Sequence, residues 1–373
     1  MPQDLGAVAG TADSNLHKHG HAFLVKHTDP SSRRTLRRAR YAKLPSMLDS
    51  YHRILVTGGL GFVGRHLVEA LVSLGKEVTI LDNVSTATDR HPPPETTLQV
   101  ADIRNSDQVA AAVAGIEMVF HLAANANGTL SVTEPRLDFE INTVGTFSLA
   151  ETLLDSDIRR LVYVSSASVY GRPRYFPMDE EHPTRPFVPY GASKLSGEVA
   201  CLALHAACGL PVVVGRPFCI YGPGDNPQEA MVEVGRYLRW HLNNQPIQIV
   251  GDIDRKTRDF VHVSDLVAGL LMIADRAETG DVFNIGSGQE TSMRQLVETI
   301  GAATGHEPEL QVISEITEDT YRLVADTSKI EKIGYAPAKP LSEGVRELAE
   351  YLGPNPELPG APTIFSRGQR AES

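Results

Sequence analysis

The 373-residue sequence is poor in cysteine, with Cys201, Cys208 and Cys219 as its only thiols, and it has a single tryptophan. No CxxC pair and no cysteine–histidine cluster has zinc-ligand spacing, so the sequence predicts no metal site. An odd and sparse set of cysteines is typical of a reducing compartment. No apolar run approaches the roughly 20 residues that span a bilayer. These absences predict a soluble, cytoplasmic protein.

Positive charge is also scarce, since 35 Lys and Arg face 46 Asp and Glu, for a net charge of −11. This balance excludes a general nucleic-acid binder, although one or two local arginines could still hold a compact anion. Residues 1–50 differ, because they hold eight basic against four acidic side chains. We expect them to form a basic flexible arm, and we expect residues 353–373 to form a flexible tail.

Short apolar runs alternate along the chain with stretches of helical periodicity. The first such unit predicts a strand at 54–57, a helix at 62–74 and a strand at 77–81. The same alternation then predicts further strands and helices, with strands at 97–101, 118–122, 161–165 and 211–215 and helices at 106–114, 137–154 and 190–207. Short parallel strands need helical crossovers on both faces, so the order predicts an α/β fold with a doubly wound parallel sheet.

Three glycines, Gly58, Gly61 and Gly64, follow the first predicted strand and open the first predicted helix. In such a loop the first glycine permits a tight turn and the second lets a pyrophosphate approach the backbone. The third lets the helix pack against the sheet, and the helix N-terminus offers its N–H groups to the phosphates. The strand before the glycines and the helix after them are the context that this motif requires. The sequence therefore predicts a Rossmann dinucleotide site.

Acidic residues end the next two predicted strands. Asp82 would accept hydrogen bonds from the adenosine ribose and would repel a 2′-phosphate, which favours NAD over NADP. Asp102 could meet the adenine amino group, or it could cap the helix that begins near Ser106. We assign residues 51–222 with 257–285 to the NAD-binding Rossmann domain. Residues 223–256 and 286–352 are expected to form a smaller substrate-binding lobe.

A candidate catalytic site follows later in the chain. Tyr190 and Lys194 lie four residues apart at the start of a predicted helix, on one face. A phenol is a poor base at neutral pH unless its pKa is lowered. The lysine ammonium and a positive nicotinamide ring would both lower that pKa. Ser166, at the end of the strand predicted at 161–165, could bind the same substrate oxygen.

With these residues the chain resembles the extended branch of the short-chain dehydrogenase/reductase family, closest to its UDP-glucose 4-epimerase-like sugar-nucleotide enzymes. The resemblance covers residues 53–352. Its markers occur in order: TGGLGFVG (57–64), LDN (81–83), ADI (101–103), HLAA (121–124), NTVGT (142–146), VSSASVYG (164–171), PYGASK (189–194), YGPG (221–224), TRDFVHVSD (257–265) and FNIG (283–286).

The resemblance implies a role for each matching residue. The pyrophosphate would be held by Gly58, Gly61, Phe62, Val63 and Gly64, and the adenosine by Asp82, Asn83, Asp102 and Ile103. The nicotinamide side would be lined by Leu122, Ala123 and Ala124, with Tyr190 as base, Ser166 as its partner and Lys194 on the ribose. Substrate contacts would come from Ser166, Ser168, Cys219, Arg258 and Arg322.

The implied reaction is a nucleotide-sugar epimerisation, with a UDP-sugar as the expected substrate. Tyr190 would take a proton from a sugar hydroxyl while hydride passes to NAD⁺, and the keto-sugar would accept the hydride back on its other face. Ser166 would stabilise the changing charge on the oxygen. Relatives also pair two long helices with those of a twin subunit, so the resemblance implies a homodimer through 137–154 and 190–207.

Two positions depart from the epimerase pattern, and a third departs from that of the related dehydratases. Cys219 stands where the family usually has an asparagine, and we interpret it as a small packing residue. Glu315 and Ile316 occupy the place of a further diphosphate arginine, for which nearby Arg322 could substitute or else form a surface salt bridge. The related dehydratases carry Asp-Glu after the catalytic hydroxyl, whereas Ala167 and Ser168 follow here, which argues against dehydration.

Other reactions of the same family stay open at this point. The chain could be a nucleotide-sugar dehydrogenase or reductase, a uronic-acid epimerase or a decarboxylase. A non-catalytic NAD-binding regulator is a further alternative, but the intact set of Ser166, Tyr190 and Lys194 argues against it.

Overall fold

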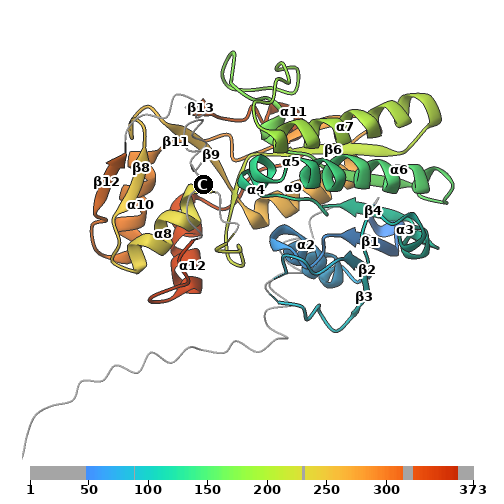
Figure 1. Ribbon diagram of the computed structural model, residues 1–373, viewed down its shortest axis with the longest axis horizontal. Coiled ribbons are helices and arrows are strands. Elements are labelled where there is room, and N and C mark those ends of the chain that lie inside the picture. The colour runs from blue at the N-terminus through green and yellow to red at the C-terminus, as the bar shows by residue number, and fades with distance from the viewer. Residues whose placement is uncertain (1–47, 88, 229–231, 314–321, 360–373) are drawn as a thin grey trace, which may run out of the picture.

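The computed structural model describes residues 48–87, 89–228, 232–313 and 322–359. Within them, seven strands form one parallel sheet in the order β10-β6-β5-β4-β1-β2-β3 (Figure 1). The strands are β1 (Arg53–Thr57), β2 (Glu77–Asp82), β3 (Thr96–Val100), β4 (Met118–His121), β5 (Arg160–Val164), β6 (Val212–Pro217) and β10 (Val282–Ile285). The predicted doubly wound Rossmann sheet is confirmed.

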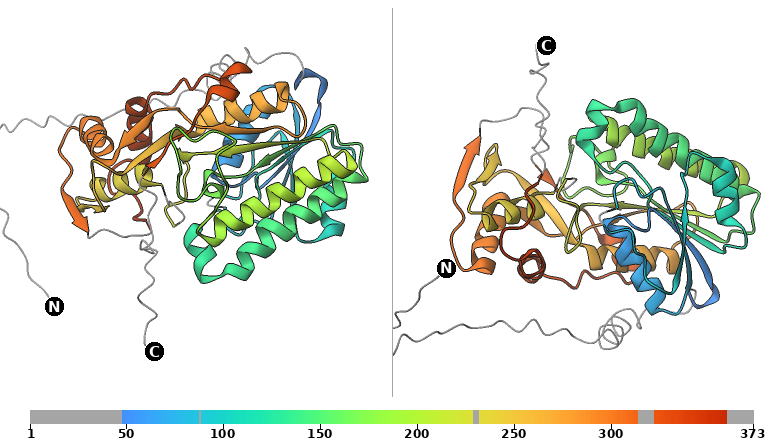
Figure 2. Two further views of the ribbon diagram at one scale, coloured as in Figure 1. Left: turned by 90° about the horizontal axis from the view of Figure 1, so that it is seen from above. Right: turned by 60° about the horizontal axis from the view of Figure 1, so that its bottom comes forward.

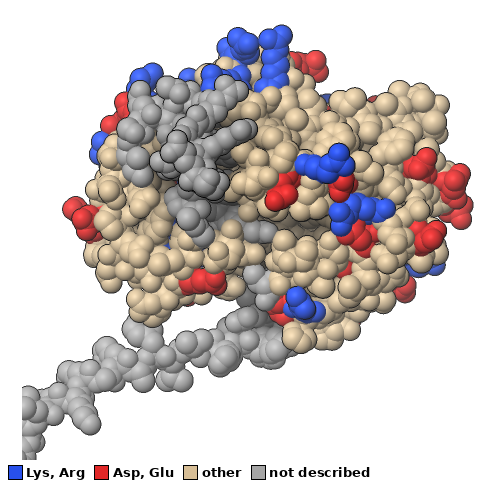
Figure 3. Space-filling view, in the orientation of Figure 1, with Lys and Arg blue, Asp and Glu red and all other residues tan. Residues whose placement is uncertain are grey.

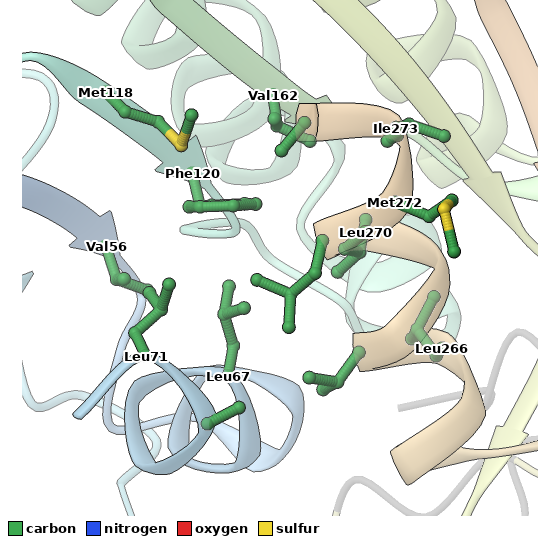
Figure 4. Close-up of a cluster of buried hydrophobic side chains, with 14 of the residues drawn as sticks. Val56, Leu67, Leu71, Met118, Phe120, Val162, Leu266, Leu270, Met272 and Ile273 are labelled. Carbon is green, nitrogen blue, oxygen red and sulfur yellow. The ribbon is translucent and has the colours of Figure 1, made fainter. Parts of the chain in front are cut away.

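Helices cover both faces of this sheet (Figure 2). One face carries α2 (Phe62–Ser73) and α9 (Val263–Arg276), and the other carries α3 (Ser106–Val113), α6 (Thr146–Leu154) and α7 (Pro189–Cys208). Alternate residues of each strand point to opposite faces. Val56 and Phe120 pack with Leu67 and Leu270 on the first face (Figure 4), whereas Leu55 packs on the second. The strands are thus buried on both sides, which fixes their carboxyl ends as a rigid edge.

The helix predicted at 137–154 is present, but it contains a wider turn. It consists of α5 (Pro135–Phe139), a π-helical turn (Glu140–Gly145) and α6, and the short α4 (Gly128–Thr133) precedes it. Such turns break the regular hydrogen-bond ladder and re-aim side chains, often at functional sites. Here the turn carries Asn142, whose buried side chain faces α7.

The second lobe has its own core. Its elements are β7 (Cys219–Tyr221), α8 (Glu233–Leu242), β8 (Ile247–Val250), β9 (Thr257–His262), β11 (Glu290–Ser292), α10 (Met293–Thr304), β12 (Leu310–Ile313), β13 (Arg322–Leu323) and α12 (Leu341–Leu352). Side chains such as Trp240, Ile249 and Leu296 fill this core. The intervening α11 (Ser328–Lys332) packs instead on β10 of the Rossmann sheet, and Ile330 belongs to the core on that side. The lobe predicted at 286–352 therefore includes a stretch that packs with the other domain.

The last three residues of the predicted flexible arm are ordered. Leu48–Ser50 form a short 3-10 helix. Leu48 is buried in the core, its N–H donates to Asp275 Oδ1 at 2.9 Å, and Lys76 Nζ donates to its carbonyl at 2.6 Å. The arm prediction is therefore wrong for residues 48–50, because the burial of Leu48 anchors this short helix. Residues 1–47 of that arm, and 360–373 of the predicted tail, lie outside the described residues.

Among the described residues, no helix combines the length and the apolar character that crossing a membrane requires.

Candidate active site

A cavity of about 600 Å³ lies between the carboxyl ends of the sheet strands and the second lobe. Nearly all the residues that the sequence assigned to cofactor or substrate line it. They are Gly58, Gly61, Phe62, Val63, Gly64, Asp82, Asn83, Asp102, Ile103, Leu122, Ala123, Ala124, Ser166, Ser168, Tyr190, Lys194, Cys219 and Arg258. The structure thus gathers residues from across some 200 positions of the sequence into one site, as the parallel topology requires.

The glycine loop fits a pyrophosphate. Gly58 has a positive φ of +69°, and a Cβ there would lie 2.7 Å from the backbone N of Ala123. A Cβ on Gly64 would overlap the carbonyl oxygen of Gly58. Gly61 is different, since its nearest neighbour would lie at 3.3 Å, so the protein itself nearly tolerates a side chain there. Gly61 is the N-cap residue of α2 and has no side chain to bond the first N–H groups of the helix, which leaves the positive helix terminus open to an anion.

Asp82 faces the cavity and also anchors two loops. Its Oδ2 accepts a hydrogen bond from the N–H of Leu60 at 3.0 Å, and its Oδ1 accepts one from the N–H of Val84 at 2.8 Å. The carboxylate therefore fixes the glycine loop relative to the loop after β2. This second task was not predicted from the sequence.

Asp102 does not cap the following helix. Asn105 caps α3 instead, since its Oδ1 accepts from the N–H of Gln108 at 3.1 Å. Asp102 pairs with Arg104, whose Nε and Nη2 lie 2.9 and 2.8 Å from its two oxygens, and it accepts from Asn83 Nδ2 at 3.2 Å. Hydrogen bonding by Arg104 holds the pKa of Asp102 well below its usual range. The capping alternative for Asp102 is thus wrong.

Tyr190, Lys194 and Ser166 meet at the cavity wall. Pro189 begins α7, so Tyr190 lies in its first turn, one turn before Lys194. Ser166 ends the segment after β5, and its Oγ accepts from the N–H of Ser168 at 3.1 Å. Lys194 is buried, with its Nζ 4.6 Å from the ring centroid of Tyr163. A cation over an aromatic face is favourable where water is excluded.

Burial disfavours the charged forms of both Lys194 and Tyr190. It lowers the pKa of Lys194 to about 8. It raises the pKa of Tyr190, while a hydrogen bond with Ser166 lowers that pKa and the charge of Asp138 raises it. The lowered phenol pKa that the sequence predicts therefore requires a further positive charge beside Tyr190, such as a nicotinamide ring.

The end of the cavity that the second lobe forms is basic, although only Arg258 among its basic residues was predicted from the sequence. Arg236 and Lys256 line it beside the predicted Arg258. The carboxylate of Glu233 lies 3.7 Å from Lys256 Nζ and 3.4 Å from Arg258 Nε. Although burial opposes it, Arg258, Lys256 and Arg236 lower the pKa of Glu233 to about 2. Lys256 stands two residues before Arg258, a spacing that brings side chains to one face of an extended chain and could have indicated it.

Known proteins are similar to this chain in sequence and in fold. Residues 54–286 match the family model of the NAD-dependent epimerase/dehydratase family. The chain belongs to this family. It is 33% identical over 308 residues to a UDP-glucose 4-epimerase of Mycolicibacterium smegmatis, covering 80% of this chain and 98% of that one. NAD is accordingly its cofactor, and the resemblance stated from the sequence motifs is confirmed.

Two solved epimerase structures agree in fold. UDP-glucose 4-epimerase of Thermus thermophilus, in complex with NAD, superposes with a TM-score of 0.75 at 30% identity, over 80% of this chain and 98% of that one. UDP-glucose 4-epimerase of Thermotoga maritima, with UDP-glucose, gives 0.76 at 30% identity with the same coverage. The residue roles themselves stay predictions for this member of the epimerase/dehydratase family.

Two further side chains near the site, His121 and Cys219, support the packing of the protein. His121, from the HLAA marker, is buried between Thr57 Oγ1 at 2.7 Å and Thr146 Oγ1 at 2.9 Å. Burial, helped by the charge of Lys194, lowers the pKa of His121 to about 3, so it is neutral and no acid–base group at neutral pH. Burial likewise raises the pKa of the Cys219 thiol, which fits a packing residue.

Arg322 does not reach the cavity. Its Nε and Nη2 lie 2.7 and 2.8 Å from the carboxylate oxygens of Glu290, and its guanidinium lies 4.0 Å from the ring centroid of Phe176. The structure therefore favours the surface salt bridge over the diphosphate contact. Glu315 and Ile316, at the family's arginine position, lie outside the described residues.

Proposed function

We propose that this family member is a nucleotide-sugar 4-epimerase that acts on a UDP-sugar. One observation carries the proposal: Tyr190, Lys194 and Ser166 line the same cavity as a glycine loop and a basic group, each of which suits a phosphate group. The glycine loop at one end suits the dinucleotide pyrophosphate. The basic lobe end suits the diphosphate of a substrate, which would place its sugar between the two, beside Tyr190.

The charge at the lobe end supports this substrate class. Arg236, Lys256 and Arg258 supply three cations beside the carboxylate of Glu233. A second carboxylate at the cavity wall, that of Asp225, is already balanced by Arg239, so the basic group favours a ligand with about two negative charges. A diphosphate ester meets that requirement, and a guanidinium such as that of Arg258 can bind phosphate oxygens with two parallel hydrogen bonds. UDP-glucose bound to the Thermotoga maritima enzyme supports the choice of a uridine nucleotide.

The side chains at the centre suit proton transfer at a sugar hydroxyl. NAD bound in the site would supply a hydride acceptor and donor for the sugar carbon. Tyr190 would take the hydroxyl proton and return it after the keto-sugar has turned over within the cavity. Ser166 would donate a hydrogen bond to the same oxygen, and the Lys194 ammonium would favour the phenolate of Tyr190. Ala167, also at the cavity wall, offers no acid for the elimination of water.

We further propose that the protein is a homodimer through α5, α6 and α7. Large apolar side chains are exposed on these helices and on the turn between α5 and α6, namely Phe139, Val144, Phe147 and Val199. In Figure 3 most of the surface over α7 is free of charged side chains. Exposed apolar side chains gathered on one face are typical of protein–protein contact sites.

A cytoplasmic location is the last part of the proposal. Cys201, Cys208 and Cys219 are free thiols, and only Cys208 is exposed. Free cysteines persist where thiols are kept reduced.

Replacing Tyr190 with Phe tests the reaction, because it removes the phenolic hydroxyl alone. We expect kcat with UDP-glucose to fall by about 10²–10⁴-fold, while NAD stays bound, as measured by coupled assay and by cofactor release on denaturation. Tyr175→Phe is the matched control: Tyr175 is exposed and bonded to Asp179, so its loss should change neither quantity.

Two results would contradict the proposal. Normal turnover by Tyr190→Phe would remove this phenol from the mechanism. A wild-type protein that consumes stoichiometric added NAD, with net oxidation of the sugar, would be a dehydrogenase rather than an epimerase.

A further inference from the structure

A buried carboxylate, Asp138, lies beside the proposed catalytic helix and has no part in the mechanism above. It is 1% exposed on α5. Its Oδ1 accepts hydrogen bonds from Asn125 Nδ2 at 2.8 Å and from Asn142 Nδ2 at 3.0 Å. Its Oδ2 is buried and has no hydrogen-bond partner among the described residues. A buried carboxylate that is incompletely satisfied costs stability, so its presence calls for another explanation.

Hydrogen bonds connect Asp138 to the turn of α7 that carries Tyr190 and Lys194. Asn142 Nδ2, which donates to Asp138, also lies 3.0 Å from Ser193 Oγ, and that hydroxyl donates to the carbonyl of Tyr190 at 3.0 Å. Ser193 directly precedes Lys194. Helices α5 and α7 pack side by side (Figure 1), so the carboxylate is held at a fixed place beside the helix that carries the lysine.

Other titratable groups around Lys194 contribute less net charge. Glu198, one turn further along α7, is bonded by both Arg216 Nε and Nη2 and by the Ser165 hydroxyl, so a cation already balances it. The remaining groups are uncharged at neutral pH. Burial raises the pKa of the Cys201 thiol on α7 to about 12, raises that of Tyr163 on β5 well above its usual range, and lowers that of His121 on β4 to about 3. In contrast, Asp138 has no basic ion-pair partner within the described part of the chain.

We propose that Asp138 is a positioning residue whose negative charge keeps the buried ammonium of Lys194 protonated beside Tyr190. This inference rests on the proposed function, because it assigns Asp138 to the same site. Burial raises the pKa of Asp138, while the hydrogen bond from Asn125 and the charge of Lys194 oppose that rise. As a carboxylate, Asp138 is fixed and dry, and no cation within the described residues forms an ion pair with it, so its field acts directly on Lys194. Such charges interact more strongly than exposed ones, because water does not screen them.

The sign of the effect can be worked out for both groups. Burial lowers the pKa of Lys194, and Asp138 opposes that fall. Burial raises the pKa of Tyr190, and Asp138 adds to that rise. Removing the negative charge must therefore lower both pKa values. In the pH profile of activity, the acid limb reports the deprotonation of Tyr190 to phenolate and the alkaline limb reports the loss of the Lys194 ammonium. Because both pKa values fall, both limbs should move to lower pH.

The test is the pH profile of kcat for Asp138→Asn, which keeps the size and an acceptor for the two amides. We expect both limbs to shift down by about one pH unit. Glu140→Gln is the matched control, because it removes one negative charge two residues later in a partly exposed side chain, and its profile should not move. Asp138→Glu retains the charge and should keep the limbs near their wild-type positions. A lower kcat at every pH, with both limbs of the profile at their wild-type positions, would overturn the inference.

NAD binding gives a second readout that is independent of turnover. Equilibrium dialysis of NAD between pH 6 and 10 should show Asp138→Asn losing affinity at lower pH than wild type, since Lys194 is proposed to contact the nicotinamide ribose. If the wild type epimerises no nucleotide sugar, the proposed function fails, and this NAD shift still decides the inference. Should Asp138→Asn not fold, Asp138→Ser offers the same amides an acceptor and is measured in the same way. Unshifted NAD binding in a folded variant would overturn the role of Asp138.

Discussion

Asp82 performs two tasks with one carboxylate, which makes its substitution informative about both. It binds the N–H groups of Leu60 and Val84, and it faces the cavity where an adenosine ribose is proposed to lie. We expect Asp82→Ala to narrow the preference for NAD over NADP by at least about tenfold, because the repulsion of a 2′-phosphate is lost. Dissociation constants for both cofactors, measured by fluorescence titration, check this.

The same variant should lower stability, since two backbone N–H groups lose their acceptor. A loss of about 1–3 kcal/mol in the free energy of unfolding is expected. Asp82→Asn separates the tasks, because its amide keeps an oxygen acceptor but loses the charge: most stability should return while the cofactor preference stays relaxed. If the ratio of the dissociation constants for NADP and NAD is unchanged in Asp82→Ala, a group other than Asp82 must discriminate between the two cofactors.

At the scale of single residues, the sequence predicted those side chains whose spacing carries a physical requirement. The glycine loop and the Tyr190–Lys194 pair are of this kind, and both line the cavity. Arg236 and Asp138 belong to no such pattern, and only the fold brings Arg236 to the cavity and Asp138 to a place beside α7. Arg322 shows the reverse error, since closeness in sequence does not decide where a side chain points once Glu290 and Phe176 offer it contacts.

At the scale of elements, the glycine loop allows a direct separation of fold from cofactor binding. A side chain on Gly64 would overlap the carbonyl of Gly58, so Gly64→Ala should cost about 1–3 kcal/mol of stability through a forced backbone shift. A side chain on Gly61 meets the protein only at 3.3 Å, at a φ of −71° that alanine adopts easily. Gly61→Ala should therefore keep its stability and lose at least about tenfold in NAD affinity.

Thermal unfolding without added cofactor and NAD titration together check this pair. The two variants act as each other's control, because each adds one methyl group to the same loop. Equal destabilisation by both, or unchanged NAD affinity in Gly61→Ala, would mean that the pyrophosphate does not approach the backbone at Gly61.

The regular elements were largely predictable, whereas their interruptions were not. Strand β1 and helix α2 follow from apolar periodicity, which reflects burial against a sheet or a helix face. The π-helical turn at Glu140–Gly145 could not be predicted in this way. It accompanies the bonds of Asn142 to Asn125 and Asp138, which are tertiary contacts with no local signature.

At the scale of the whole molecule, the site depends on the chain passing repeatedly between two units. Strand β9 carries Arg258 at its start and leads directly into α9, which packs on the Rossmann sheet. The short β7 follows β6 and pairs with β9. The cavity walls are therefore tied together by continuous backbone at several points. The sequence predicted a second lobe, but it could not indicate that α11 returns to the first domain, because five residues carry too little periodicity.

Assembly of two copies is the remaining property of the whole molecule that can be tested. Val144 and Phe147 lie three residues apart on the helix that runs through α5 and α6, so they share a face, and Phe147 is 42% exposed. We expect Phe147→Glu to convert a dimer into a monomer, because it places a charge in an apolar contact where water would be excluded. Light scattering coupled to size-exclusion chromatography measures the mass.

Val312→Glu is the matched control, since Val312 is 64% exposed on β12, on the lobe away from these helices. The mass of this variant should stay that of the wild type. A wild-type monomer, or a dimer that survives Phe147→Glu, would show that these helices cover only their own sheet.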